Sequence, residues 1–267
     1  MIDDRYLDVD FLDDAKTLGV GMGAMPPAVF GAKQPTFEDA IQTIPRSQWQ
    51  AEIERIDAGQ IHTEHLITRI YNQGQEGSCV SNATAQAHEI IQARQYGKDR
   101  VVHLSAISLY KRCGRSPGSG SMVNDNLDEM VSTGILPLNN DANKAKFKHV
   151  FPATGFYTSY PDGWQETAKL FKGVEWFDIR SLDGFITALI LGYPVVYGRA
   201  GHSICAVRPK MAGGRLTVMY VNSWSVNWGQ GAGDFQGGFG NDSESMIRSG
   251  AGWAFALRSV TVTQEQI

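Results

Sequence analysis

Cysteine is scarce in this chain of 267 residues. Only three are present, Cys79, Cys113 and Cys205, and three is an odd number. Proteins that depend on disulfides usually carry a denser, even set of cysteines. The count therefore argues against a disulfide framework and favours a reducing compartment. One of the three cysteines then has to be explained by chemistry or by packing.

Long hydrophobic runs are also missing. The most apolar stretch, residues 185–196, is too short to span a bilayer, and Gly192 and Pro194 interrupt it. The chain begins Met-Ile-Asp-Asp-Arg, with acidic residues where a signal peptide carries basic ones. We therefore expect no transmembrane helix, no signal peptide and a cytoplasmic or other intracellular location.

Positive charge is not in excess either. The chain has 24 Lys and Arg against 28 Asp and Glu, a net charge of −4, and no long basic run. Nucleic acid and anionic membranes are therefore not expected as partners. His62 and His65 resemble half of a metal site, but no third ligand stands at an evident spacing, so we predict neither a metal nor another cofactor.

The order of the predicted elements indicates an α+β chain. Residues 1–43, with a patch rich in Gly, Pro and Met, are expected to form an extension or arm before the main domain at 44–267. Helices come first and strands later, which favours two lobes, a helical one at about 72–180 and a β lobe at about 181–267. Hydrophobic spacing and capping residues predict helices at 48–58, 78–96, 105–112, 126–133 and from Ser181 to about 191. Strands are predicted at 195–199, 203–208, 216–222 and 253–263, with a hairpin turn at 212–214.

One short stretch, Tyr-Asn-Gln-Gly-Gln-Glu-Gly-Ser-Cys-Val-Ser-Asn at 71–82, carries the chemistry. Cys79 stands where a helix should begin, and the unpaired N–H groups there stabilise a thiolate, the nucleophilic form of cysteine. Far downstream, His202 can form an ion pair with the thiol and later protonate a leaving amine, while Asn222 can orient the imidazole. Gln73 and the Cys79 N–H can hold an oxyanion, and Trp224 can cover the bond between His202 and Asn222.

Each of these residues has an ordinary alternative. A lone cysteine is usually inert packing, a lone His or Asn is usually structural, and a lone Trp usually belongs to a core. The combination decides against those alternatives. Cys205 lies on the strand face opposite His202, and Cys113 ends a helix at apolar spacing, so we expect both to be buried packing residues.

The combination resembles the papain-like cysteine peptidases. Their signature is Cys-Gly-[Ser/Ala]-Cys-[Trp/Tyr], with the His and Asn some 130 to 150 residues downstream. Here His202 follows Cys79 by 202 minus 79, or 123, and Asn222 by 222 minus 79, or 143. Residues 72–75, Asn-Gln-Gly-Gln, and 222–224, Asn-Ser-Trp, with Trp228-Gly229, resemble two further family segments. The resemblance implies a papain-like two-lobed fold, with a helical N-terminal lobe, an antiparallel β-barrel-like C-terminal lobe and a cleft between them.

The departures from the family pattern concern the surroundings of the site. Glu76 stands where the family usually has a disulfide cysteine, which fits a compact, disulfide-free bacterial or viral type. We predict that Glu76 pairs with Arg115 in place of that bridge.

The resemblance also suggests where a substrate would lie. It implies that Gly77, Gly118, Ser119, Gly120 and Trp224 line the substrate site, with residues 118–120 pairing to an extended substrate. A flexible loop is the alternative for residues 118–120. The arm lacks the long charged helical pattern of the family's inhibitory prosegments. Regulation of activity by the arm would therefore work differently, for example by placing residues 19–30 near the cleft.

These residues predict a thiol-dependent endopeptidase that hydrolyses polypeptides through a Cys79 acyl-enzyme. A rival hypothesis is a papain-like structural or assembly component, for example of a virus particle, that docks through residues 1–43 and keeps residual or maturation-only activity. A third is an acyl transferase that passes the acyl group to an amine.

Overall fold

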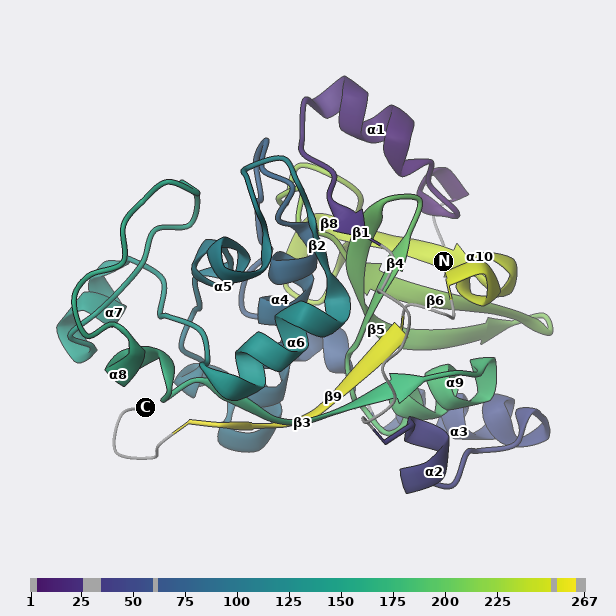
Figure 1. Cartoon of the computed structure of the whole chain (residues 1–267). Coiled ribbons are helices and arrows are strands. Elements are labelled where there is room, and N and C mark those ends of the chain that lie inside the picture. The colour runs from purple at the N-terminus through teal and green to yellow at the C-terminus, as the bar shows by residue number, and fades with distance from the viewer. Residues whose placement is uncertain (1–3, 26–34, 60–61, 251–253, 263–267) are drawn as a thin grey trace.

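A computed structural model of the chain describes residues 4–25, 35–59, 62–250 and 254–262. A mainly helical half lies beside a half built on a seven-stranded sheet (Figure 1). The helices are α1 (Phe11–Leu18), α2 (Phe37–Ala40), α3 (Arg46–Ala58), α4 (Cys79–Tyr96), α5 (Ala106–Cys113), α6 (Val123–Ser132), α7 (Asp141–Lys146), α8 (Gln165–Ala168), α9 (Leu182–Ile190) and α10 (Glu244–Gly250), with 3-10 turns η1 (Asp4–Tyr6), η2 (Thr63–Leu66) and η3 (Lys98–Arg100). The strands are β1 (Ala24–Met25), β2 (Ser121–Met122), β3 (Lys172–Ile179), β4 (Val195–Arg199), β5 (His202–Ala212), β6 (Arg215–Val221), β7 (Gln230–Ala232), β8 (Phe235–Ser243) and β9 (Ala254–Thr261).

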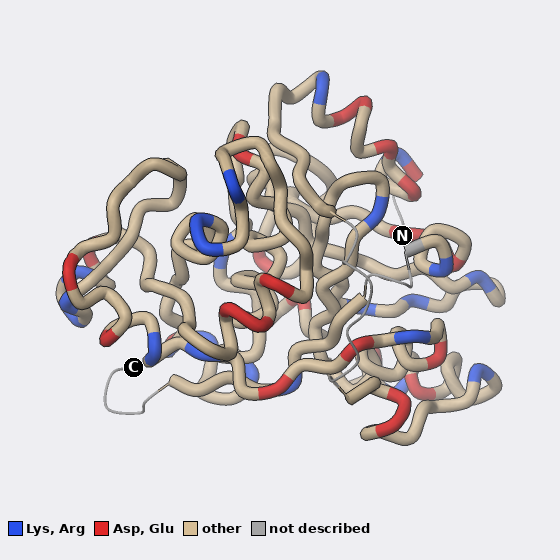
Figure 2. The backbone as a smooth tube through the Cα atoms, in the orientation of Figure 1, with Lys and Arg blue, Asp and Glu red and all other residues tan. Residues whose placement is uncertain are grey.

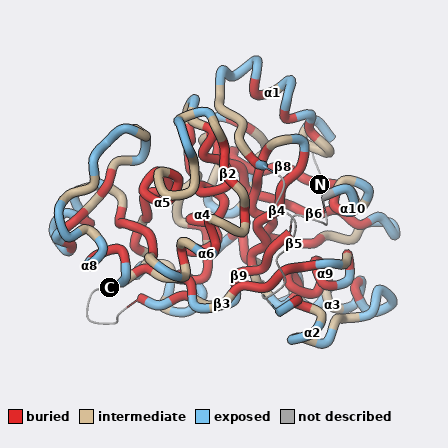
Figure 3. The backbone as a smooth tube through the Cα atoms, viewed as in Figure 1, coloured by how far each residue is buried: buried red, intermediate tan, exposed pale blue. Residues whose placement is uncertain are grey.

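Helix α4 is the centre of the molecule. Its apolar residues recur at helical spacing, which predicts one buried face, but every residue from Cys79 to Ala93 is buried. The reason is that α4 packs against α5 and α6 on one side and against β5 and β9 on the other (Figure 3). It is thus a core helix shared by both halves of the molecule.

Polar side chains on α4 are tolerated in this core because the neighbouring loops supply partners. The Glu89 carboxylate accepts hydrogen bonds from the Tyr71 hydroxyl and the Leu104 N–H, both at 2.7 Å, and forms an ion pair with Arg69 at 2.8 Å. Buried charges are stable only when they are paired in this way. The same contacts tie the segment before Gln73 to α4.

The large sheet is antiparallel, in the order β3-β9-β4-β5-β6-β8-β7. The predicted antiparallel character is therefore confirmed, but the strand order is open, with β3 and β7 at its edges, and does not describe a closed barrel. Strand β3 also belongs to this sheet, although the sequence analysis had placed its residues in the helical lobe at about 72–180.

Most predicted elements are present with shifted ends. The side chains of Ser105 and Ser181 cap α5 and α9 as expected, and β4 has the predicted bounds. Helix α6 begins three residues early, because Val123 at its start is buried in the core. The strand predicted at 253–263 is β9, and residues 253 and 263 lie outside the described residues.

The glycine-rich segment at 229–240 forms strands rather than a loop. It contains β7 and most of β8, which pair with each other, and β8 also pairs with β6. A Cβ on Gly240 would lie 2.3 Å from the Tyr220 hydroxyl oxygen. Glycine is required at this strand position because an aromatic side chain of the neighbouring strand packs against the backbone.

Charged residues of both signs are interspersed over the two halves (Figure 2). No helix within the described ranges combines the length and the apolar character needed to cross a membrane.

A buried ion pair supports the sheet beside the inter-lobe seam. Arg199 of β4 and Asp242 of β8 are 5% and 0% exposed and pair at 2.7 Å, and Arg199 also donates to the Val9 carbonyl oxygen at 2.9 Å. We expect Arg199→Met to lower the free energy of unfolding by about 3 to 5 kcal/mol, because it leaves the Asp242 carboxylate buried without its partner. Chemical denaturation measures this change.

The matched control is Arg258→Met, which breaks an exposed pair with Glu175 and should cost less than about 1 kcal/mol. Equal losses in the two variants would contradict the assignment.

Candidate active site

Cys79 is the first residue of α4, and its side chain is fully buried at the seam between the two halves. Burial raises the pKa of its thiol, and the backbone of Ser203 and of Gly23 lies near enough to offset part of that rise. Since Ser203 directly follows His202, the thiol lies next to the start of β5. The fold thus brings together residues that are more than 120 positions apart in the chain.

His202 begins β5, and Asn222 directly follows β6. The antiparallel register that places Cys205 opposite Val221 puts these two ends beside each other. The His202 Nε2 atom lies 2.8 Å from the Asn222 Oδ1 atom, which also accepts the Ser223 N–H at 2.7 Å. Because the Asn222 oxygen is an acceptor, this geometry assigns the proton of a neutral His202 to Nε2 and leaves Nδ1 as the basic atom.

Two aromatic rings enclose the His202 imidazole. Trp224 lies 4.7 Å from it between ring centroids, as expected for a residue that covers the bond to Asn222. Phe11 of α1 lies at the same distance from another direction, at an interplanar angle of 70°. The Nδ1 atom is buried and has no hydrogen-bond partner among the described residues.

Gln73 is fixed by its neighbours rather than free for a ligand. Its side-chain oxygen accepts a hydrogen bond from the Ser223 hydroxyl at 2.6 Å, so its amide nitrogen points the other way. That nitrogen donates to the carbonyl oxygens of Gly21, at 2.8 Å, and Glu76, at 2.9 Å. Both donors of the predicted oxyanion-binding amide are therefore occupied, one of them by the N-terminal arm.

Residues 20–25 of the arm, called here the crossing segment, run along the seam in front of Cys79. The Gly21 N–H donates to the Gly74 carbonyl oxygen at 2.9 Å. The N–H groups of Gly23 and Ala24 both donate to the carbonyl oxygen of Gly201, directly before His202. The position predicted for an open cleft is thus filled by the chain's own backbone.

The far end of the crossing segment pairs as a strand. β1 lies parallel to β2, and the Ser121 N–H donates to the Gly23 carbonyl oxygen at 2.8 Å. A Cβ on Gly23 would lie 2.2 Å from the Gly77 carbonyl oxygen and 2.7 Å from the Gly120 Cα. Only glycine allows this approach, and the described part of residues 19–30 thus lies where the sequence analysis had suggested.

Burial sets the charge state of the pair. Burial raises the pKa of the Cys79 thiol to about 11, and burial lowers the pKa of His202 to about 4. Both shifts disfavour the charged forms, against the expectation of a stabilised thiolate. In this arrangement the thiol and the imidazole are both neutral at pH 7.

The residues predicted to line a substrate site fall into three groups. Gly77 and Gly120 lie against the crossing segment. Trp224 is buried behind His202, so its contacts are with the imidazole. The Ser119 hydroxyl is used within its own turn, accepting the Arg115 N–H at 2.8 Å, and Gly118 is exposed and does not pair with the arm.

The prediction that Glu76 pairs with Arg115 is wrong. The Glu76 Oε1 atom accepts the N–H groups of Gly155 and Phe156, at 3.0 and 2.9 Å, and no ion pair between Glu76 and Arg115 occurs among the described residues. The carboxylate joins the loop before Cys79 to the loop around Gly155. Both backbone donors bind Oε1, and Oε2 is buried without a hydrogen-bond partner among the described residues.

All three cysteines are free. Cys205 is fully buried on the strand face away from Ile204, as predicted, whereas Cys113 is only half-buried and donates toward the Asp125 carbonyl oxygen at 3.6 Å. Burial raises the pKa of both thiols.

Comparison with known proteins gives matches at the level of structure. No family model matches the sequence. No curated protein matches it either. Among solved structures, xylellain, a cysteine protease from Xylella fastidiosa, has a TM-score of 0.61 at 14% identity, covering 90% of this chain and 96% of that one.

Two further matches are proenzymes by their names. Procathepsin B S9 from Trypanosoma congolense has a TM-score of 0.59 at 13% identity, over 94% of this chain and 89% of that one. Digestive procathepsin L 3 from the larval midgut of Tenebrio molitor has a TM-score of 0.58 at 15% identity, over 94% and 80%. At these identities the likeness is one of fold.

Displacing the crossing segment should make Cys79 reactive. We expect Gly23→Ala to raise the rate of Cys79 alkylation by iodoacetamide at pH 7.5 at least about tenfold, because the added Cβ collides with Gly77. Each unit by which the pKa of Cys79 falls back toward 9.0 raises the thiolate fraction about tenfold. Peptide mapping by mass spectrometry measures the rate at Cys79.

Lys16→Ala changes an exposed arm residue far from these contacts and serves as the control. Equal alkylation rates in wild type, Gly23→Ala and Lys16→Ala would show that the crossing segment does not protect the thiol.

The buried imidazoles predict a pH dependence of stability. Burial lowers the pKa of both His88 and His202 to about 4, below the ordinary 6.5, so the unfolded chain binds more protons between these values. The free energy of unfolding should therefore fall as the pH falls from 6.5 to 5, by up to about 1.4 kcal/mol per pH unit for each imidazole.

Denaturation between pH 7 and pH 5 measures this slope, and His202→Gln should reduce it by up to about 1.4 kcal/mol per pH unit. A slope unchanged by that substitution would contradict the assignment.

Proposed function

We propose that this chain, which has the predicted papain-like fold, is a thiol-dependent endopeptidase that acts through Cys79. The observation that carries the proposal is the 2.8 Å contact between His202 Nε2 and Asn222 Oδ1, beside a thiol at the N-terminus of a helix. This set contains a nucleophile, a base with a free basic nitrogen and a residue that orients the base. The substrate class is extended polypeptide.

The reaction follows from the roles of these groups. His202 Nδ1 takes the Cys79 proton, and the thiolate attacks the carbonyl carbon of the scissile peptide bond. The Gln73 amide and the Cys79 N–H bind the resulting oxyanion, and His202 then protonates the leaving amine. Water, activated by His202, attacks the thioester, which releases the carboxylic acid and restores the Cys79 thiol.

The described arrangement fits a latent form of this enzyme. The crossing segment covers Cys79, the Gly21 carbonyl oxygen occupies a donor of Gln73, and Phe11 encloses His202. A substrate therefore needs the crossing segment to leave. Once it has left, solvent lowers the pKa of Cys79 and raises that of His202, which favours the ion pair.

The rival functions have less support. The three solved structures compared above are a cysteine protease and two procathepsins, and none of them supports a viral origin. Docking of residues 1–43 to an assembly partner stays a prediction, as does an intracellular location. Transfer of the acyl group to an amine would use the same acyl-enzyme and differs only in the acceptor.

The proposal is tested with a peptide library and a thiol-directed active-site probe, applied to wild type and to Gly23→Ala. We expect Cys79→Ala to abolish both cleavage and labelling, and His202→Ala to lower the cleavage rate about 10²- to 10⁴-fold with folding retained.

Cys113→Ser is the matched control, because Cys113 is the most accessible of the three thiols, and it should leave cleavage unchanged. Cleavage that persists in Cys79→Ala would refute the proposal.

A further inference from the structure

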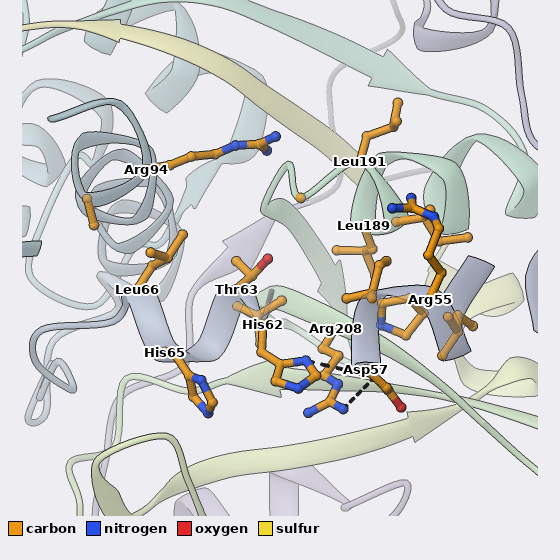
Figure 4. Close-up of a pocket in the computed structure, with 17 residues that line it drawn as sticks. Arg55, Asp57, His62, Thr63, His65, Leu66, Arg94, Leu189, Leu191 and Arg208 are labelled. Atoms are coloured by element: carbon orange, nitrogen blue, oxygen red, sulfur yellow. Dashed lines mark hydrogen bonds and ion pairs between the residues drawn. The ribbon is translucent and has the colours of Figure 1, made fainter. Parts of the chain in front are cut away.

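A cavity of about 470 Å³ lies between α3, η2, the C-terminal end of α4, the end of α9 and β5 (Figure 4). It is remote from the candidate active site. Arg94 follows Cys79 by fifteen residues on α4, which is about 22 Å at the helical rise. Arg208 follows His202 by six residues on β5, which is about 20 Å.

The walls of this cavity combine aliphatic side chains with charged and polar ones. The aliphatic ones include Leu66 and Leu189, whose side chains project toward the cavity in Figure 4, together with Leu191 at its edge and Ile53 and Ile56 of α3. The described residues that line it include no Phe, Tyr or Trp. A cavity of this size accommodates a small ligand, and the aliphatic part of its wall suits a flexible alkyl chain.

The acidic groups beside the cavity are already paired. Asp57 and Glu64 both pair with Arg208, at 2.7 and 2.5 Å. Arg55 of α3, which also lines the cavity, pairs with Glu52 at 2.9 Å. Asp57 and Glu64 share the single Arg208 guanidinium, so this group keeps one unbalanced negative charge, and in Figure 4 it lies at the other end of the cavity from Arg94.

One cation at the rim has no acidic partner. Arg94 is exposed, lies 5.1 Å above the Tyr193 ring and forms no ion pair with any residue in the described ranges. Figure 4 shows its side chain reaching from α4 over the cavity, with the His62 ring farther down. The His62 Nδ1 atom is buried without a hydrogen-bond partner, since Asp57 lies 3.8 Å away.

We propose that this cavity is a binding site for a medium-chain carboxylic acid, distinct from the peptidase site. The alkyl chain packs against the leucine and isoleucine side chains, which removes its surface from water. The carboxylate pairs with the Arg94 guanidinium at the rim, in a charge-assisted hydrogen bond. The ligand class follows from these two features together, aliphatic walls and one cation without an acidic partner.

Decanoate, used below its micelle concentration, is the probe. Titration calorimetry on the full chain should show saturable binding, and decyltrimethylammonium, with the same chain and the opposite charge, should show none. We expect Arg94→Gln to weaken decanoate binding about five- to tenfold, and Arg100→Gln, an exposed cation outside the cavity, to leave it unchanged.

A second variant tests the walls. Leu191 lies at the rim and is partly exposed, so Leu191→Glu should fold and weaken decanoate binding at least tenfold by placing a carboxylate beside the ligand. Three results would overturn the proposal: no saturable binding of decanoate, equal binding of the cationic amphiphile, or equal affinity in wild type and Arg94→Gln.

Discussion

The burial of α4 between two halves of the molecule is the constraint on which the rest of the structure depends. Its first residue is Cys79, and ten residues later Glu89 binds Tyr71, two positions before Gln73. The Tyr71 carbonyl oxygen in turn accepts the Ser225 N–H at 3.0 Å, and the Gln73 N–H donates to the Ser223 carbonyl oxygen at 2.9 Å. One helix therefore positions the thiol directly and, through the loop at 71–73, also positions the loop that carries Asn222.

The same burial opposes the chemistry proposed for the site. A thiolate and an imidazolium are both charged, and their cost rises as water is removed. The crossing segment lies against Cys79, while Phe11 and Trp224 enclose His202. Under the proposed function, latency and catalysis use a single arrangement of side chains and differ in whether the N-terminal residues that cover them are in place.

The residues of the candidate site could be predicted because each stands in a local motif. A cysteine at a helix N-terminus, with a glutamine six residues before it, is visible in a short window, and so are the strand patterns that carry His202 and Asn222. The capping serines of α5 and α9 are local signals for the same reason. Such features depend on the backbone preferences of a few neighbouring residues, and a short stretch of sequence is enough to predict them.

The environment of those residues could not be predicted, because it depends on segments that are distant in the chain. The sequence determined that a thiol, an imidazole and an amide lie at the ends of a helix and two strands. Only the tertiary structure decided that Phe11 and Gly23 cover them, that Glu76 binds two backbone N–H groups, and that the glycines of β8 stand in a strand. The physical reason is that solvent exclusion and close backbone approach are set by what packs against a residue, and a single segment does not contain its own neighbours.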